Sequence, residues 1–238
     1  MKEGAKIVVD LATLPDSGPS GGYFNDDGPL PWRRLFLTVC SRILISNLMA
    51  RIKEFDRDKA LDAAVDVFRE HGFDGTSTEM LVKAMKIGRQ SLYDTFGDKW
   101  VLYRLAVERY VSAETEAHIG KLRSTGRAID GISAMMARLV AEADRACLGV
   151  NSICEFGQSR PDLAEVHHAA DHRLRHAARE CVRQAQDAGD LDKTLSVDAV
   201  IDFLIASIAG IRIAARAGAG QETLQSLGEL ALRALMPR

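Results

Sequence analysis

The stretch TSTEMLVKAMKIGRQSLYDTF, residues 76–96, decides the fold. It opens with Thr76-Ser77-Thr78-Glu79, which matches a capping box: the Thr76 hydroxyl accepts from the Glu79 amide, and the Glu79 carboxylate reaches back. We expect a helix to begin there, to end at the tight turn Lys86-Ile87-Gly88, and to be followed by a second short helix. Two short helices joined by a three-residue turn have the geometry of a helix-turn-helix.

A longer amphipathic helix is expected before this pair, over residues 57–71. Apolar side chains recur there at i, i+3, i+4 and i+7, the spacing of one helix face: Leu61, Ala64, Val65 and Phe68. Gly72 ends the pattern. The three helices together predict a helix-turn-helix domain over residues 51–104.

The second short helix, residues 89–96, has a polar outer face. Helical spacing turns Leu92 and Phe96 inward and leaves six polar side chains outward: Arg89, Gln90, Ser91, Tyr93, Asp94 and Thr95. Arg and Gln side chains can make bidentate contacts to guanine and adenine edges in a major groove. The net charge of −2 gives no sign of a nucleic-acid partner, but four basic residues gather around this helix: Lys83, Lys86, Arg89 and Lys99. On this pattern alone, a three-helix bundle with a polar surface and no ligand is the alternative, and the pattern does not exclude it.

Two spaced patterns in the same region are more specific. They read Phe68-x-x-x-Gly72-Phe73-x-x-Thr76-Ser77 and Leu92-Tyr93-x-x-Phe96-x-x-Lys99. In these residues, over about 57–104, the chain resembles the N-terminal domain of the tetracycline-repressor (TetR) family of transcription regulators. The resemblance implies a DNA-binding transcriptional regulator, usually a repressor that a small-molecule effector releases from its operator.

The resemblance also implies roles for single residues at the DNA. The implied base contacts are Arg89, Gln90 and Ser91, and the implied phosphate contacts are Thr76, Ser77, Tyr93, Thr95 and Lys99. Lys86 and Asp94 complete the predicted DNA-binding set. Asp94 either accepts from a cytosine amine or opposes a phosphate. Gly88 departs from the family pattern, which usually has a serine there, so a contact from that side chain is lost.

The rest of the chain predicts further helices and an all-α fold. Helical patterns separated by glycines and by Pro161 are found at about 98–122, 127–142, 148–157, 162–188, 196–216 and 221–235. No strand pattern competes with them. We expect residues 105–238 to form a helical effector-binding and dimerisation domain.

The segment from Val197 to Ala217 is apolar around the whole helix, so we expect it to be buried on all sides. Together with the last helix it can form half of an intermolecular four-helix bundle, or simply an ordinary domain core. The resemblance to TetR regulators implies a homodimer through the last two helices. A two-fold dimer predicts a pseudo-palindromic operator in double-stranded DNA.

An effector cavity is harder to predict. Seven residues are candidates for lining one, although ordinary core packing explains them as well: Met135, Met136, Leu139, Cys147, Val150, Cys154 and Phe156. Cys147 stands beside the expected helix start at Leu148, where a thiol can gain acidity and react with oxidants or electrophiles. The stretch from Cys147 to Asn151 is similar to a subgroup of TetR regulators, some of which respond to reactive small molecules. A buried, inert thiol is the alternative.

Other kinds of site find little support. His168, His172 and His176 follow i, i+4 and i+8, a spacing that can chelate a metal, but they point away from the apolar face of their helix. We therefore expect them to meet water, and we expect no metal or cofactor. The sequence has no Gly-rich phosphate loop, G-x-S-x-G, HExxH or CxxC motif, so we expect no enzyme.

Residues 1–50 differ from the rest. Four prolines and several glycines in residues 1–32 predict a flexible N-terminal extension. Our hypothesis is that translation begins at Met49 and that residues 1–48 are an upstream extension. The arginine pair at 33–34 precedes only seven uncharged residues, too few for an export signal or a membrane helix. With four cysteines in 238 residues, we expect a cytoplasmic protein.

Overall fold

The computed structural model describes residues 23–25, 28–30 and 55–237. The chain divides into two units, Met1–Glu54 and Phe55–Arg238. In the first unit, strand β1 (Tyr23–Asn25) pairs antiparallel with β2 (Gly28–Leu30), with Tyr23 opposite Leu30. This short hairpin was not predicted, because each strand has only three residues and shows no alternation. The rest of the expected N-terminal extension, with the start at Met49, lies outside the described residues.

The second unit begins with α3 (Arg57–His71), whose start and end agree with the prediction. The side chain of Asp56 caps it by accepting from the amides of Asp58 and Lys59. Its buried face contains the predicted Leu61, Ala64, Val65 and Phe68, together with Ala60. Gly72 ends the helix with a φ of 68°, which favours glycine.

Helix α4 (Thr78–Met85) starts one residue later than a cap at Thr76 predicts, and the capping box is wrong. The N-cap is Ser77, whose Oγ accepts from the amide of Met80 at 3.2 Å. Thr76 is buried, and its hydroxyl donates to the carbonyl of Gly72 at 2.6 Å. The Thr76 hydroxyl thus closes the corner between α3 and α4, which leaves the cap to the next residue.

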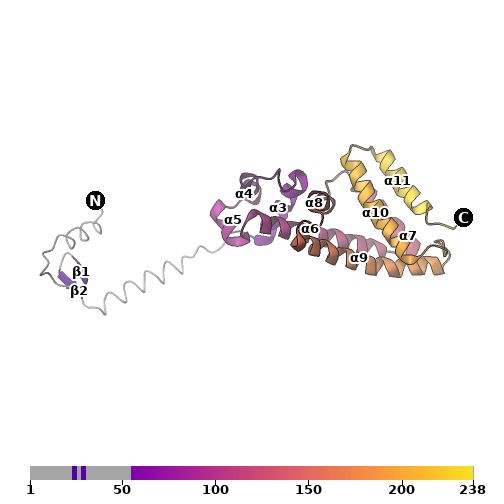
Figure 1. The fold of residues 1–238 in the computed structure, drawn as a ribbon, viewed down its shortest axis with the longest axis horizontal. Helices are drawn as coiled ribbons and strands as arrows, with labels where there is room; N and C mark the ends of the chain where they lie inside the picture. Colours follow the sequence, from indigo (N-terminus) through magenta and orange to yellow (C-terminus); the bar gives the residue numbers. More distant parts are fainter. Residues whose placement is uncertain (1–22, 26–27, 31–54, 238) are drawn as a thin grey trace. The chain divides into compact units, whose positions relative to one another are not determined.

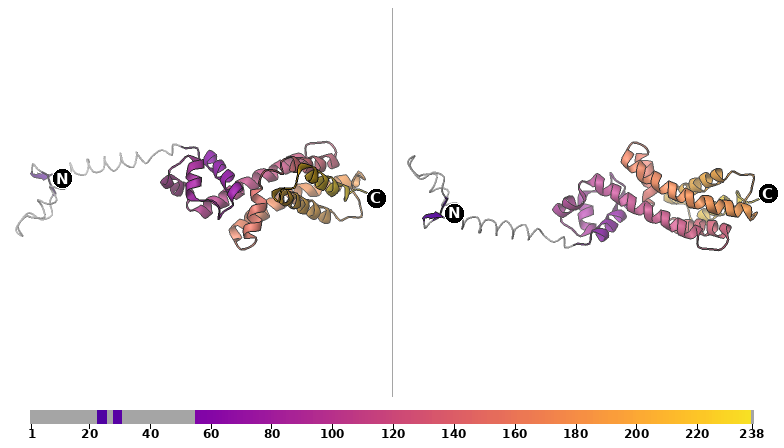
Figure 2. Two further views of the ribbon diagram at one scale, coloured as in Figure 1. Left: turned by 90° about the horizontal axis from the view of Figure 1, so that it is seen from above. Right: turned by 90° about the horizontal axis from the view of Figure 1, so that it is seen from below.

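Helix α5 (Arg89–Phe96) follows the predicted three-residue turn, in which Lys86 has a left-handed φ of 54°. The chain continues with α6 (Lys99–Leu122), α7 (Ala128–Ala141), α8 (Leu148–Phe156), α9 (Pro161–Asp187), α10 (Val197–Arg216) and α11 (Gln221–Arg233). The prediction placed every one of these ends within two residues. Helices α6 and α9 lie side by side over much of their length (Figures 1 and 2).

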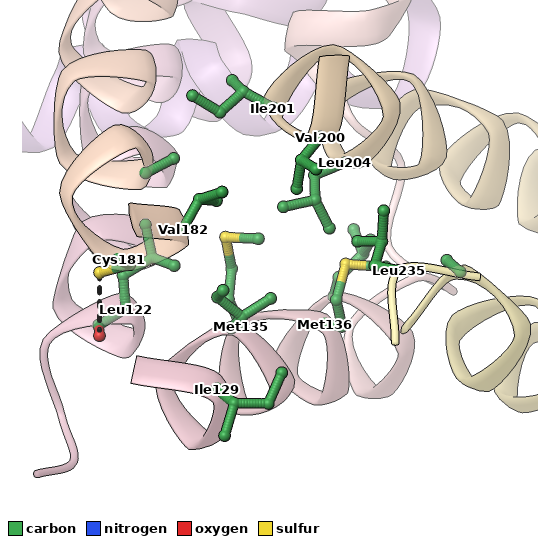
Figure 3. Packing of buried hydrophobic residues seen from close by; sticks show 14 of the residues in the cluster. Leu122, Ile129, Met135, Met136, Cys181, Val182, Val200, Ile201, Leu204 and Leu235 are labelled. Carbon is green, nitrogen blue, oxygen red and sulfur yellow. Dashed lines mark hydrogen bonds between the residues drawn. The ribbon is translucent and has the colours of Figure 1, made fainter. Parts of the chain in front are cut away.

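Two hydrophobic cores hold the second unit together. One joins α3, α4 and α5 to the first half of α6 and reaches Leu148 and Leu163. The other joins the end of α6 to α7, α9, α10 and α11, as Figure 3 shows for Leu122, Met135 and Val182. Helix α6 contributes to both cores, so the expected domain border at 104–105 falls inside a continuous helix.

Within a single chain, helix α10 is buried on one side only, so the expected burial on all sides stays a prediction for the dimer. Val200, Ile201 and Leu204 are buried, but Phe203 is 40% and Ile213 52% exposed. The neighbouring α11 likewise exposes Leu227 and Leu230. Both helices thus bury one apolar face inside the chain and leave another at its surface. None of the helices in the described ranges is long and apolar enough to cross a membrane.

Candidate nucleic-acid interface and interhelical cleft

The outer face of α5 is polar, as predicted. Leu92 and Phe96 are buried beneath it, while Arg89, Gln90, Tyr93 and Asp94 are exposed and Ser91 is half-buried. The N-cap is Gly88, which has no side chain to bind the first amides of the helix. Arg89 and Gln90 therefore stand beside uncapped helix amides, an arrangement that suits the edges of bases and phosphates.

Asp94 is engaged with Gln90 one turn earlier. The amide Nε2 of Gln90 donates to Oδ1 of Asp94 at 2.8 Å. This pair restrains the Gln90 side chain and leaves its carbonyl oxygen and one N–H for another partner. Asp94 was predicted only as a direct contact to DNA, although the i, i+4 spacing of Gln90 and Asp94 could have indicated the pair.

The predicted phosphate contacts divide into two groups. Ser77 is exposed at the start of α4, where the hydroxyls of Thr78 and Tyr93 lie 3.5 Å apart, and Lys86 is exposed in the turn. Thr76, in contrast, is buried, and Thr95 is half-buried with its Oγ1 enclosed and unpaired among the described residues. The ammonium group of Lys99 lies 4.3 Å from the centre of the Phe73 ring. The exposed face thus contains Ser77, Lys86 and Tyr93 and leaves out the side chain of Thr76.

Helix α8 is attached to the corner between α3 and α4. Oε2 of Glu155 accepts from the amide of Phe73, and Oε1 accepts from the amide of Asp74, both at 3.2 Å. Phe156 packs edge-on against Phe73 and Trp100, with ring centres 5.7 and 5.1 Å apart. The structure therefore places Phe156, a candidate cavity residue, in a joint between α8 and the helix-turn-helix.

The candidate cavity residues on α7 lie in the C-terminal core. Met135, Met136 and Leu139 are each at most 2% exposed. Figure 3 shows Met135 and Met136 pointing among the side chains of α9, α10 and the chain's last residues. This is the core-packing interpretation that the sequence analysis left open.

A cleft of about 400 Å³, the interhelical cleft, lies between α6, α8, α9 and α10. Cys147 and Val150 line it, as predicted, and they also line a neighbouring pocket of about 360 Å³ together with Cys154. The structure thus brings three of the seven candidates together and leaves the other four elsewhere. Cys147 is the N-cap of α8 and is half-buried.

The polar residues of the cleft that were missed include a group at one end of it: Tyr110, Glu114, His118 and Arg212. Glu114 accepts from Arg138 at 2.9 Å and from Arg212 at 3.4 Å. His118 is 6% exposed, and burial lowers its pKa to about 4, with a further lowering by Arg138 and Arg212 that Glu114 opposes. Glu114 and His118 stand at i and i+4 on α6, a signal that the sequence did offer.

The histidines on α9 behave as expected. His168, His172 and His176 are all exposed. In the described ranges, no group of three or more His, Cys, Asp or Glu side chains is arranged to hold a metal ion. His167 differs, because its Nε2 lies 2.9 Å from the hydroxyl of the buried Ser152, and burial lowers its pKa.

Two family models match the chain. Residues 60–105 match "Bacterial regulatory proteins, tetR family", and residues 122–227 match "Tetracyclin repressor-like, C-terminal domain". The uncharacterized HTH-type transcriptional regulator YezE of Bacillus subtilis (strain 168) is 31% identical over 193 residues, which cover 79% of this chain and all of YezE. The HTH-type transcriptional repressor ComR of Escherichia coli (strain K12) is 31% identical over 196 residues, covering 77% of this chain and 90% of ComR.

Solved structures agree in fold. A cysteine mutant of the TetR family regulator CifR, complexed with 26-bp double-strand operator DNA, has a TM-score of 0.66 and 29% identity and covers 78% of this chain and 100% of that chain. The reduced form of E. coli NemR has a TM-score of 0.68 over 76% of this chain and 96% of that chain. Its identity of 17% makes it a match of fold alone.

Proposed function

Because the chain belongs to the TetR family of bacterial transcriptional regulators, we propose that it acts as a cytoplasmic, homodimeric repressor. It binds a pseudo-palindromic operator in double-stranded DNA and is released by a small-molecule effector. The observation that carries the proposal is the exposed polar face of α5, with Arg89 and Gln90 beside the uncapped N-terminus of the helix. The operator complex of the similar regulator CifR supports the DNA partner.

The roles at the DNA follow from exposure. Arg89, Gln90 and Ser91 read base edges in the major groove, and Asp94 orients Gln90 through its 2.8 Å hydrogen bond. The phosphate contacts come from exposed groups around this face: Ser77, Lys86 and Tyr93. Lys99, three residues after the end of α5, adds positive charge near the DNA backbone. Thr76 and Thr95 are enclosed, so they stabilise the fold under the exposed face of α5 and make no phosphate contact.

The dimer forms through α10 and α11. Phe203 and Ile213 on α10 and Leu227 and Leu230 on α11 leave apolar surface exposed on a single chain. A second copy that applies the same two helices covers this surface symmetrically. Two reading helices are then held at a fixed spacing, as a two-fold operator requires.

The effector acts through α8. One side of this helix lines the interhelical cleft with Cys147, Val150 and Ile153, and its Glu155 holds the amides of Phe73 and Asp74. A ligand that favours a different position of α8 therefore shifts the corner of the helix-turn-helix. Such coupling typically changes operator affinity by about 1–3 kcal/mol.

Operator binding tests the proposal. The operator is selected from random DNA with the parent protein, and affinity is measured by fluorescence anisotropy at fixed salt for the parent, Arg89→Ala and Gln90→Ala. Each replacement is expected to cost about 1–3 kcal/mol on the operator and much less on random DNA, because it removes a base contact. Lys121→Ala, an exposed change at the far end of α6, is the control. Parent-like binding by both variants would show that α5 is not the reading helix.

A further inference from the structure

The wall of the interhelical cleft is mainly hydrocarbon. Six aliphatic side chains from four helices line it: Val111, Val150, Ile153, Leu174, Ile205 and Ile208. Its volume of about 400 Å³ lies within the range of small-molecule sites. The cleft therefore suits a ligand with a large apolar part.

The charges at the polar end of the cleft neutralise one another. Glu114 pairs with Arg138 at 2.9 Å and with Arg212 at 3.4 Å. Arg138 also pairs with Glu142 at 2.9 Å, so two guanidinium groups meet two carboxylates. Arg212 is further satisfied by the carbonyls of Glu142 and Arg145.

The remaining acid of the wall is paired as well. Asp171 accepts from Nε of Arg175 at 2.7 Å. Throughout the described wall, each carboxylate and guanidinium group thus has an opposite charge within 3.4 Å. An ionised ligand would give up its hydration here without meeting a free counter-charge, which disfavours both anions and cations.

His118 offers the cleft a different group. Three buried side-chain polar atoms of the described residues have no hydrogen-bond partner, and only one of them, Nδ1 of His118, belongs to a residue that lines the cleft. Nε2 of this ring lies 3.9 Å from Oε2 of Glu114, so the single proton of the neutral ring belongs on Nε2. Nδ1 then carries a lone pair that can only accept, and because this atom is buried, a ligand donor has to enter the cleft as far as the His118 ring to reach it. Burial keeps the ring neutral at pH 7, since it lowers the pKa to about 4.

We propose that the interhelical cleft binds an uncharged, mainly apolar molecule with one hydroxyl or N–H donor, and that His118 Nδ1 accepts from this donor. The inference rests on the proposed function, because it names the chemical class of the effector. Ions are selected against by the paired wall charges, and a purely apolar molecule binds more weakly than a donor because it does not gain the hydrogen bond to Nδ1.

Four probes of similar size test the proposal on the full-length protein. Isothermal titration calorimetry is performed with 1-octanol, octanoate, octylamine and heptyl methyl ether. We expect 1-octanol to bind at least tenfold more tightly than octanoate or octylamine. We expect it to bind at least about fivefold more tightly than heptyl methyl ether, which has no hydrogen-bond donor. Equal or tighter binding of an ionised probe, or equal binding of alcohol and ether, would overturn the proposal.

Two variants locate the site. His118→Phe removes the acceptor and is expected to abolish the preference for alcohol over ether while ether binding persists. Ala209→Phe fills the cleft and is expected to weaken 1-octanol at least tenfold. Circular dichroism checks that both variants fold. If a variant fails to fold, the comparison of the four probes on the parent protein still tests the preference for an uncharged donor. Unchanged 1-octanol binding by folded Ala209→Phe would place the ligand elsewhere.

Operator binding of the ligand-free parent is measured in parallel, so that the two proposals fail separately. A parent that binds its operator but does not prefer 1-octanol contradicts the ligand class alone. A parent that prefers 1-octanol but shows no sequence-specific DNA binding contradicts the proposed function and leaves the ligand class in place.

Discussion

Helix α5, the proposed DNA-reading helix, and the interior of the C-terminal half use polar side chains in opposite ways. On α5, Arg89, Gln90 and Asp94 are exposed, and their replacement leaves the core of Leu92 and Phe96 intact. Between α6, α7 and α10, charged groups are largely withdrawn from water: the Arg212 side chain is 4% exposed and that of Arg138 12%. Substitutions on the exposed face of α5 are therefore expected to change DNA binding without changing stability. Substitutions in the wall of the cleft are expected to change ligand binding and stability together. Three experiments can break or sharpen this contrast.

The largest effect is expected from Glu114→Ala. The change leaves Arg212 buried beside no carboxylate, so we expect a loss of about 3–5 kcal/mol in the free energy of unfolding, measured by urea denaturation. Glu116→Ala is the matched control on the same helix, since the pair of Glu116 with Arg173 is solvent-exposed and worth less than about 1 kcal/mol. Similar losses for the two variants would remove the contrast between surface and interior charges.

A somewhat smaller effect is expected from pH. The folded pKa of His118 is about 4 against an ordinary 6.5, so the unfolded chain binds a proton first as the pH falls. Stability from this group is complete above about pH 6.5 and is lost between about 6.5 and 4, by roughly 2–3 kcal/mol in total. The measurement is urea unfolding of the parent and His118→Phe at several pH values in that window. We expect a shallower slope for the variant, and parallel slopes would speak against a buried neutral histidine.

The smallest effect on stability is expected where the two regions meet. Glu155→Gln keeps one acceptor for the amides of Phe73 and Asp74 and loses the charge, so we expect a cost of about 1 kcal/mol or less at this exposed position. The same change should reduce the effect of a bound effector on operator affinity, because α8 holds the corner less firmly. Glu165→Gln, exposed on α9, is the control. Full effector response in Glu155→Gln would assign the coupling to other contacts.

Much of the fold was predictable because its helix ends are encoded locally. Glycines, Pro161 and the caps stop or start helices through their own backbone geometry, which a single sequence displays. The exception is instructive: Thr76 and Ser77 are both competent caps, and the choice was made by a bond from Thr76 to the Gly72 carbonyl across a corner of the fold. This hydrogen bond depends on how the end of α3 lies relative to the start of α4 in the folded chain, so the sequence of α4 alone could not show which residue caps it.

The site was predictable to a different extent in its two parts. The polar face of α5 lies on one short helix, so periodicity alone predicted which of its side chains turn outward, while the base-contact roles of Arg89 and Gln90 came from the resemblance to TetR regulators and stay a prediction. The polar end of the cleft combines Glu114, Arg138 and Arg212 from three helices, with 24 positions separating the first pair and 98 separating Glu114 from Arg212. No pattern within a window of sequence joins residues so far apart. Similarly, α10 has apolar residues on all its sides, so its sequence did not show which face packs against the chain's own core and which face stays exposed.

Helix α6 converts a small tilt at one of its ends into a larger displacement at the other. Its 24 residues form one helix that takes part in both cores. At 1.5 Å of rise per residue such a helix is about 36 Å long, so a tilt of about 5° at one end displaces the other by about 3 Å. Half-sites on B-DNA are set by a helical repeat of about 34 Å, and two reading helices that each move by this amount fall out of step with successive major grooves. For the proposed dimer, an ångström-scale change at the cleft would therefore separate a matched from a mismatched operator.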